Sequence, residues 1–253
     1  NNFFRRYHSY FKNNNILTVS IDDPRQFLNS DLSIIPYPIN KKFLKSEKNT
    51  KLLYGVKYIS FNNDIIKNKK YIKNNVRNIL IVLSGFDLKR QSLKILNVIL
   101  KLDYKVNIKV ISNNNNDIDL IKKSRNLNNL ELILNIKNIN NFLDWADLVL
   151  TGEGILRFET ALKGVPTIFF NNLDNTKKNL ILINAFLKLK TARFLNYKTL
   201  NSTKLLKLLN VYFKNKKLRI KQSLSGTRLF DVNGASRISF EINKLYNKKY
   251  FKA

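Results

Sequence analysis

The sequence predicts an α/β fold built on a doubly wound parallel sheet, Rossmann-like in its alternation of strands and helices. Apolar runs of strand length alternate with segments of helical period over most of the chain, and such alternation is typical of parallel sheets. The run NILIVLS, residues 78–84, is continuous and β-branched, as in a strand that helices cover on both faces. With 253 residues, 44% of them hydrophobic, the chain can bury one large core or two small ones.

The elements that follow residue 78 come in a regular order. After the first strand, Leu93, Leu96 and Leu100 form one helical stripe. Strands are then expected at 106–112, 131–134, 147–150 and 167–170, and helices at 117–125, 138–146, 154–163, 175–189, 200–214 and 234–247. The strand 147–150, the helix 154–163 and the strand 167–170 form a compact βαβ unit.

The first 65 residues have a different pattern. NILTVSIDDP, residues 15–24, predicts one strand, and LLYGVKYIS, residues 52–60, predicts a connection rich in loops. Pro36 and Pro38 cannot lie within a helix or a central strand. We therefore expect residues 1–66 to be too short for a sheet of their own and to form the remnant of an N-terminal Rossmann-like domain with a linker. Residues 67–253 are expected to form a C-terminal nucleotide-binding domain.

The positive charge of the chain favours anionic partners but does not identify a specific one. The net charge is +29 and the isoelectric point is about 10.2, which predicts a general attraction for polyanions. The lysines are scattered, however, and no zinc spacing, ribonucleoprotein motif or helix-turn-helix occurs, so no specific nucleic acid partner is expected. The lack of cysteine suits the cytoplasm. The longest uncharged apolar run, 179–187, is shorter than the ~20 residues of a transmembrane helix, so no such segment is expected.

Two loops at strand ends are candidate sites, because ligands of doubly wound sheets bind outside the carboxyl ends of the strands. In LSGFDLKR, residues 83–90, Ser84 and Gly85 can present backbone N–H groups to an anion. The alternative interpretation is an ordinary strand-to-helix turn that Asp87 caps.

The second loop is TGEG, residues 151–154, which precedes a predicted helix. Unpaired N–H groups and the helix dipole favour a phosphate at such a position. Glu159, five residues into the helix, can accept two hydrogen bonds from a vicinal diol such as a ribose. The alternatives are that Glu159 faces solvent or pairs with Arg157 or Lys163.

The segment TGEGILRFETALKGVPTIFFNNLDNTKKN, residues 151–179, resembles the nucleotide-sugar segment of GT-B type proteins. It is most similar to the UDP-sugar hydrolase of pseudaminic acid biosynthesis and its spore-coat polysaccharide relatives, and next to the glycosyltransferase family 28 C-terminal domain. Four other segments are similar to that hydrolase in the same order: SIDDPRQFLNSDLSI (20–34), LLYGVKYISFNNDI (52–65), ILIVLSGFD (79–87) and FDVNGASRI (230–238).

The resemblance implies the C-terminal domain of a GT-B type fold with the tail of an N-terminal domain, and it implies a set of binding residues. The diphosphate would face Ser84, Gly85 and Phe86 on one side and Gly152, Gly154 and Ile155 on the other. Glu159 would hold the ribose, and Asp174 and Asn175 would border the sugar. The resemblance implies neither a metal nor another cofactor. The main departure from the family is Glu153, where a small neutral residue is expected and where a carboxylate would repel a pyrophosphate unless Arg157 compensates.

The catalytic residue is unknown at this stage. The family's catalytic histidine lies in a G-x-G-H segment, and no such segment occurs in this sequence. His8, the only histidine, has no glycine beside it and is interpreted as a surface residue. Asp22 and Asp23 form a carboxylate pair at a strand end, which suits acid-base chemistry or a metal, or a helix-starting turn before Pro24.

Taken together, these observations predict a cytoplasmic protein that binds a UDP-sugar. The first hypothesis is a hydrolase that releases UDP from an amino-deoxy sugar in surface glycan biosynthesis, with its catalytic segment upstream of this chain. The alternatives are a GT-B type glycosyltransferase that transfers the sugar from a UDP-sugar, and a diverged nucleotide-binding module without catalysis. The oligomeric state is left open.

Overall fold

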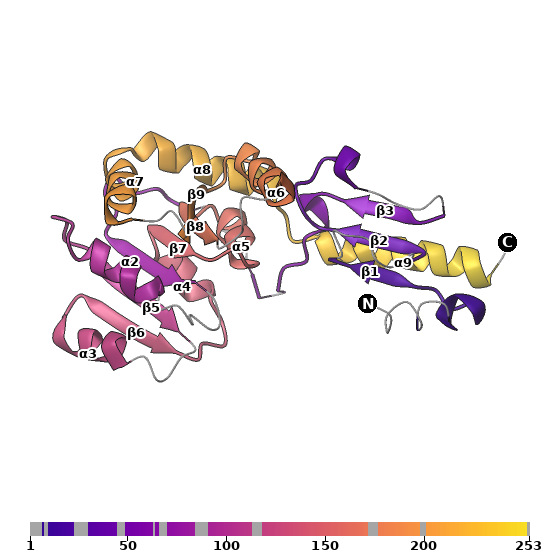
Figure 1. The fold of residues 1–253 in the computed structure, drawn as a ribbon, viewed down its shortest axis with the longest axis horizontal. Helices are drawn as coiled ribbons and strands as arrows, with labels where there is room; N and C mark the ends of the chain where they lie inside the picture. Colours follow the sequence, from indigo (N-terminus) through magenta and orange to yellow (C-terminus); the bar gives the residue numbers. More distant parts are fainter. Residues whose placement is uncertain are drawn as a thin grey trace. The chain divides into compact units, whose positions relative to one another are not determined.

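The computed structural model describes residues 7, 10–22, 30–44, 49–62, 64–65, 70–83, 91–112, 118–171, 177–197 and 201–251. The chain divides into two compact units (Figure 1). The first unit comprises residues 1–63, 180–186 and 231–253, and the second comprises residues 64–179 and 187–230.

A six-stranded parallel sheet forms the centre of the second unit, with the strand order β6-β5-β4-β7-β8-β9. The strands are β4 (Asn78–Val82), β5 (Asn107–Ser112), β6 (Leu130–Leu134), β7 (Leu148–Thr151), β8 (Thr167–Asn171) and β9 (Arg193–Asn196). Every neighbouring pair is parallel. This confirms the doubly wound parallel sheet. The strands that follow β4 extend the sheet in one direction and those from β7 onward extend it in the other, so the order reverses between β4 and β7.

Helices cover both faces of this sheet. They are α2 (Gln91–Ile99), α3 (Ile118–Asn126), α4 (Asn140–Trp145), α5 (Leu156–Leu162) and α7 (Ser202–Lys214). Residues 180–186 of the helix α6 (Lys177–Lys188) belong to the first unit. On one face, Ile79 and Ile81 of β4 join a core with residues of α2 and α7. On the other face, Leu80 of β4 packs with Leu143 of α4. Burial on both sides explains why β4 is apolar at consecutive positions instead of alternating.

The sequence analysis missed the helix α8 (Lys216–Leu229) and the edge strand β9. Every residue of β9 is at least partly accessible, so its four residues carry little of the apolar signal of a buried strand. The buried positions of α8 are Arg219, Gln222, Ser223 and Gly226. A helix that buries polar and small residues lacks the apolar stripe on which sequence prediction depends.

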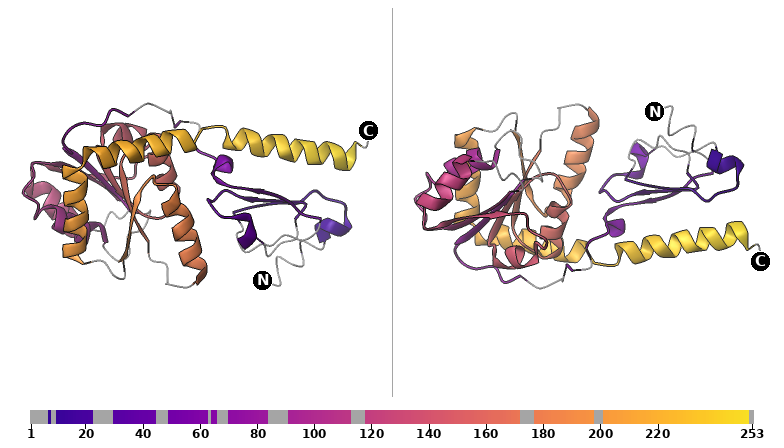
Figure 2. Two further views of the ribbon diagram at one scale, coloured as in Figure 1. Left: turned by 90° about the horizontal axis from the view of Figure 1, so that it is seen from above. Right: turned by 90° about the horizontal axis from the view of Figure 1, so that it is seen from below.

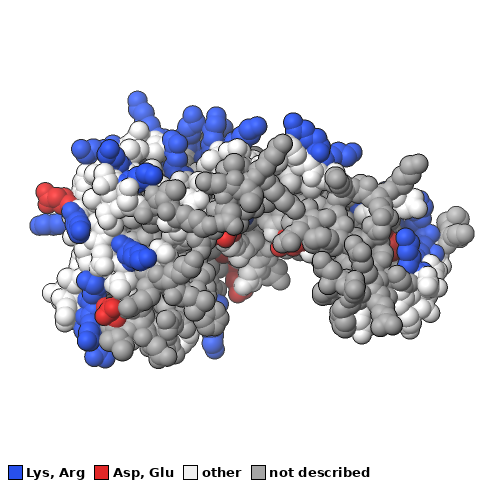
Figure 3. Space-filling model, in the orientation of Figure 1, with Lys and Arg blue, Asp and Glu red and all other residues white. Residues whose placement is uncertain are grey.

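The polar buried face of α8 is satisfied by hydrogen bonds within the second unit. The guanidinium of Arg219 donates to the backbone carbonyl of Asn74 at 2.6 Å and to the carbonyl of Tyr212. Gln222 donates to the hydroxyl of Tyr212 at 2.6 Å, and this hydroxyl donates to the carbonyl of Thr167 in β8 at 2.9 Å. These bonds fasten α8 to the end of α7 and to the sheet, while Lys and Arg side chains line the edge where α8 lies (Figure 3).

The first unit contains a three-stranded parallel sheet of order β1-β2-β3. Its elements are β1 (Val19–Ile21), β2 (Leu32–Ile35), the 3-10 helix η1 (Lys41–Phe43), β3 (Lys51–Tyr54), the 3-10 helix η2 (Val56–Tyr58) and the C-terminal helix α9 (Gly234–Tyr250). The expectation that these residues form no sheet is therefore wrong. A third strand lies in the segment that we interpreted as loop, and α9 lies along the strands (Figure 2). Ile238 of α9 joins Leu32, Ile34, Leu53 and Tyr58 in one core.

The motif FDVNGASRI anchors the start of α9. Arg237 forms a two-pronged ion pair with Asp231, at 2.7 and 2.8 Å, and also donates to the carbonyl of Lys57 at 2.9 Å. A Cβ atom at Gly234 would lie 1.9 Å from the carbonyl oxygen of Ile59. The structure therefore gives this motif a packing role, in which only glycine allows the helix to approach the chain after η2.

We expect Gly234→Ala to lower the free energy of unfolding by about 2 kcal/mol or more, because the added methyl group forces α9 away from Ile59. Urea unfolding monitored by circular dichroism measures this change. Ser236→Ala, at an exposed position of the same helical turn, is the control and should stay within about 0.5 kcal/mol of the wild type. Equal midpoints for the wild type and Gly234→Ala would contradict the close approach.

Candidate functional site

The candidate site lies at the carboxyl ends of three neighbouring strands in the second unit. The loops singled out in the sequence follow β4, β7 and β8, and the register pairs Val82 with Thr151 and Thr151 with Phe169. The strand order reverses between β4 and β7, which is where ligands of doubly wound sheets bind. Ser84, Gly85, Phe86, Asp174 and Asn175 lie outside the described residues. The structure therefore describes the predicted residues of the β7 loop alone.

The two glycines of the TGEG turn differ in what surrounds them. A Cβ atom at Gly152 would lie 1.9 Å from the carbonyl oxygen of Leu83, the residue that follows β4. The fold itself therefore requires Gly152, since it brings the β7 loop against the end of β4. A Cβ atom at Gly154 would meet no atom within 4 Å. Contacts with the described residues therefore do not require glycine at position 154.

The helix α5 starts directly after this turn with no side-chain cap. Ile155 is the residue before its first turn, and no side chain there accepts from the first backbone N–H groups. Ile155 is 49% exposed, which is ordinary for a single aliphatic side chain at a protein surface. The N–H groups of a helix start need an acceptor, and here the acceptor can come from a ligand or from water.

Glu159 is the most informative residue of the site. Its side chain is only 9% exposed, and burial raises the pKa of its carboxyl group. Both pairing alternatives fail, because Lys163 pairs with Asp144 at 2.8 Å and the guanidinium of Arg157 lies over the ring of Phe169. Within the part of the chain that the structure describes, the Glu159 carboxylate has no hydrogen bond or ion pair. A mostly buried carboxylate is costly to keep charged, and groups of this kind are frequent at binding sites.

Glu153 should repel a bound anion less strongly than the sequence suggests. The residue is exposed. Desolvation raises the pKa of its carboxyl group, and attraction to Arg157 opposes that rise. An exposed carboxylate can turn toward water, and its charge is screened by salt.

We therefore expect Glu153→Gln to change the affinity for UDP by less than about threefold, the size of effect usual for an exposed and screened charge. Isothermal titration calorimetry at low and at physiological salt measures it. A gain of tenfold or more at both salt concentrations would show instead that the carboxylate faces the diphosphate.

Asn171 is a candidate residue that the sequence analysis missed. It ends β8 at the same edge of the sheet, and it is 1% exposed. Its side-chain oxygen has no hydrogen-bond partner in the part of the chain that the structure describes. Asn171 could have been predicted from the sequence, because it is a polar residue directly after the apolar run TIFF. A polar residue at the carboxyl end of a strand is a candidate for ligand binding in this kind of sheet.

The other sequence candidates give no centre of chemistry. Asp22 follows β1 in the first unit, where its carboxylate accepts a hydrogen bond from the hydroxyl of Tyr37. Asp23 and His8 lie outside the described residues. Among the described residues, no group of three or more His, Asp or Glu side chains gathers as a metal site would require. No helix of the described part of the chain is both long and apolar enough to cross a membrane.

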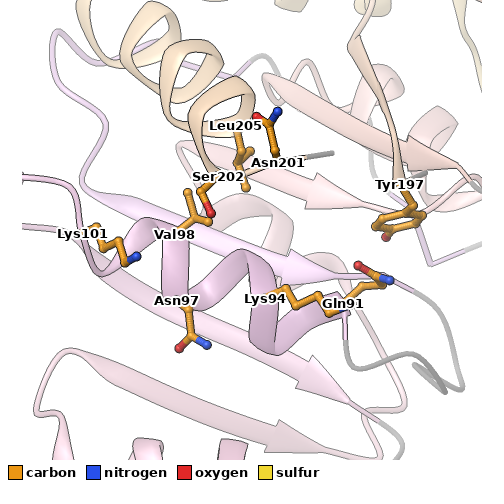
Figure 4. Close-up of a pocket in the computed structure, with 9 residues that line it drawn as sticks. All are labelled: Gln91, Lys94, Asn97, Val98, Lys101, Tyr197, Asn201, Ser202 and Leu205. Atoms are coloured by element: carbon orange, nitrogen blue, oxygen red, sulfur yellow. The ribbon is translucent and has the colours of Figure 1, made fainter. Parts of the chain in front are cut away.

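A cavity of about 410 Å³ lies elsewhere in the second unit, between α2 and α7 (Figure 4). The residues that line it come from these two helices and from the segment that joins β9 to α7: Gln91, Lys94, Asn97, Val98, Lys101, Tyr197, Asn201, Ser202 and Leu205. Of the predicted site residues that the structure describes, Gly152, Gly154, Ile155 and Glu159, none lines this cavity.

Comparison with solved structures identifies the fold. MurG of Acinetobacter baumannii superimposes with a TM-score of 0.65 at 14% identity, over 94% of this chain and 76% of that one. The chain has the fold of the GT-B glycosyltransferases. Anabaena Alr3699/HepE, solved in complex with UDP and glucose, superimposes with a TM-score of 0.59 at 12% identity, over 93% of this chain and 74% of that one. At such identities, the likeness concerns the fold.

Sequence comparison adds little to this. No family model matches the chain. The uncharacterized protein MJ1062 of Methanocaldococcus jannaschii is 27% identical over 139 residues, which are 51% of this chain and 29% of MJ1062. The chain thus spans less than a third of this relative. None of the proteins named here is described as a hydrolase, so the likeness to the hydrolase of pseudaminic acid biosynthesis stays a prediction.

Proposed function

We propose that this protein binds a UDP-sugar at the carboxyl edge of the six-stranded sheet. The observation that carries the proposal is Glu159, whose mostly buried carboxylate pairs with none of the described residues and lies beside the reversal of strand order. The 2′- and 3′-hydroxyl groups of a ribose offer two donors to the two oxygens of one carboxylate. A ribose at this place would donate hydrogen bonds to the carboxylate of Glu159.

The remaining roles follow from the position of the two loops. The diphosphate would be held by the backbone amides of the turn Gly152–Gly154 and by Ser84, Gly85 and Phe86 after β4. The sugar would be bordered by Asp174 and Asn175, with the amide of Asn171 behind them. Amides and nearby Lys or Arg side chains stabilise a leaving diphosphate without a metal. The complex of Alr3699/HepE with UDP and glucose supports this choice of ligand.

The reaction that we propose is transfer of the sugar from UDP to an acceptor, as the GT-B fold of MurG suggests. Hydrolysis of the sugar–UDP bond is the second candidate, and the segment FDVNGASRI in its family order favours it. A base for either reaction is not assigned, because no described residue of the site is a histidine. The proposed location is the cytoplasm, where UDP-sugars occur and where a chain without cysteine is suited.

Calorimetry with UDP, UMP and uridine tests the binding proposal. We expect UDP to bind more tightly than UMP, because only UDP fills the cradle of amides between the two loops. No heat of binding at millimolar UDP would overturn the proposal. With binding established, UDP release from UDP-N-acetylglucosamine in water alone identifies a hydrolase, and release that requires an added acceptor identifies a transferase. Binding without release under either condition would show that this chain alone turns over neither reaction with this sugar, and a chain extended at its N-terminus then separates a missing catalytic segment from a module without catalysis.

A further inference from the structure

The helix α8 is inverted relative to an ordinary surface helix. Its buried side holds Arg219, Gln222, Ser223 and Gly226. Its outer side exposes two aliphatic residues, Ile220 at 37% and Leu224 at 41%. Ile220 and Leu224 lie one helical turn apart, so they form a small apolar strip on the outer side of α8.

Cations accompany these aliphatic residues on the same side of the helix. Counted from Lys217, the exposed residues of this stripe lie three, four, seven and eleven positions further along the helix: Ile220, Lys221, Leu224 and Arg228. We call this stripe the basic face. Figure 3 shows Lys and Arg side chains along the edge of the second unit where α8 lies.

Neither α7 nor α8 contains an acidic residue that could offset the charge of the basic face. The sequence from residue 175 to residue 230 contains no Asp or Glu, while Lys and Arg recur throughout. The outer positions of α7 continue the pattern with the exposed residues Lys204, Lys207, Val211 and Lys214. The positive charge is scattered over the chain as a whole, but α7 and α8 carry Lys and Arg residues without any Asp or Glu. This creates a local positive potential.

We propose that the basic face binds the surface of a membrane rich in anionic lipids. Cations attract the anionic head groups, and aliphatic side chains between them enter the boundary of the acyl region, as in helices that lie in a membrane interface. Single-stranded nucleic acid is less suited, since its bases stack on aromatic side chains, and the basic face has none. The inference is independent of the UDP site, because no residue of the basic face belongs to the loops around Glu159.

Sedimentation with vesicles tests this inference on the chain as it stands. Vesicles of phosphatidylcholine with about 30% phosphatidylglycerol are compared with pure phosphatidylcholine vesicles at low and high salt. We expect binding to the anionic vesicles alone and release at about 0.5 M salt, where the Debye length is short. The triple variant Lys217→Gln, Lys221→Gln, Arg228→Gln should bind about 100-fold more weakly, at about fivefold for each cation lost. Ile220→Gln with Leu224→Gln should also weaken binding, with the net charge unchanged.

The matched control removes the same charge elsewhere in the second unit. Lys105→Gln, Lys122→Gln, Lys137→Gln changes three exposed lysines that lie outside α7 and α8. This variant should bind the vesicles within about threefold of the wild type, because its basic face is intact. Equal losses in the two triple variants would overturn the proposal in favour of net charge. Failure to bind anionic vesicles at low salt, or a selective loss of RNA binding in the basic-face variant, would overturn it as well. UDP affinity, measured alongside, should be the same in all variants.

Discussion

Replacing Gly152 with alanine is expected to destabilise the second unit by more than about 3 kcal/mol, which is exceptional for the addition of one methyl group. The new Cβ atom would lie 1.9 Å from the carbonyl oxygen of Leu83. That oxygen is backbone at the end of β4, so it cannot turn aside as a flexible side chain would. Either the β7 loop or the end of β4 must move, and both border the reversal of strand order. Thermal unfolding and urea unfolding of the purified variant measure the loss.

Gly154→Ala is the matched variant, two residues further along the same turn. Its Cβ atom meets nothing within 4 Å, so the stability should stay within about 0.5 kcal/mol of the wild type. If the open space belongs to the diphosphate, UDP should bind roughly tenfold more weakly, as expected when a buried contact of about 1.4 kcal/mol is lost. Equal destabilisation by the two substitutions would contradict the distinction between a glycine that packing requires and one that a ligand requires. Unchanged UDP affinity in Gly154→Ala would remove this glycine from the site.

The sheet of the second unit could be predicted because its strands are buried on both faces. Such burial makes residues 79–82 of β4, 148–150 of β7 and 168–170 of β8 continuously apolar, and helices of clear period separate these strands. The edge of the sheet at which the loops meet then follows from the parallel topology alone. Glu159 was found in the same way, from its place in the helix after the TGEG turn.

Other features could not be predicted, because they depend on contacts between residues that lie far apart in the sequence. Helix α8 escaped prediction because it buries Arg219 and Gln222, whose partners are backbone carbonyls and a hydroxyl from elsewhere in the chain. The contact of α9 with the first sheet joins Gly234 to Ile59, which lie far apart in the sequence. No local pattern signals such a pairing. The isolation of Glu159 is likewise a property of its neighbours, since Lys163 and Arg157 have other partners.

Glu159→Gln is expected to weaken UDP binding by roughly 10- to 100-fold, the equivalent of about 1.5–3 kcal/mol for hydrogen bonds to a charged acceptor. The neutral amide has nearly the same size, so packing is preserved while the charge and one of the two acceptor oxygens are lost. Calorimetry with UDP measures the change, and Glu153→Gln, at an exposed position, is the control. Comparable losses in the two variants would indicate a general charge effect and would contradict a ribose contact at Glu159.

The same substitution should make the free protein more stable at pH 7. Burial raises the pKa of Glu159 above its ordinary value of 4.5, so the folded state binds this proton more tightly than the unfolded state. The favourable contribution of the protonated group is complete below pH 4.5 and is lost as the pH rises through the raised pKa of the folded state. Glutamine mimics the protonated group at every pH. The stability advantage of Glu159→Gln, measured by urea unfolding, should therefore be near zero below pH 4.5 and rise to a plateau of about 1 kcal/mol at neutral pH, the low end of the cost of burying an unpaired polar group. If Glu159 serves a ligand, Glu159→Gln lowers the affinity for UDP but raises the stability of the fold. If Glu159 instead stabilises the fold, the same substitution lowers both the affinity and the stability.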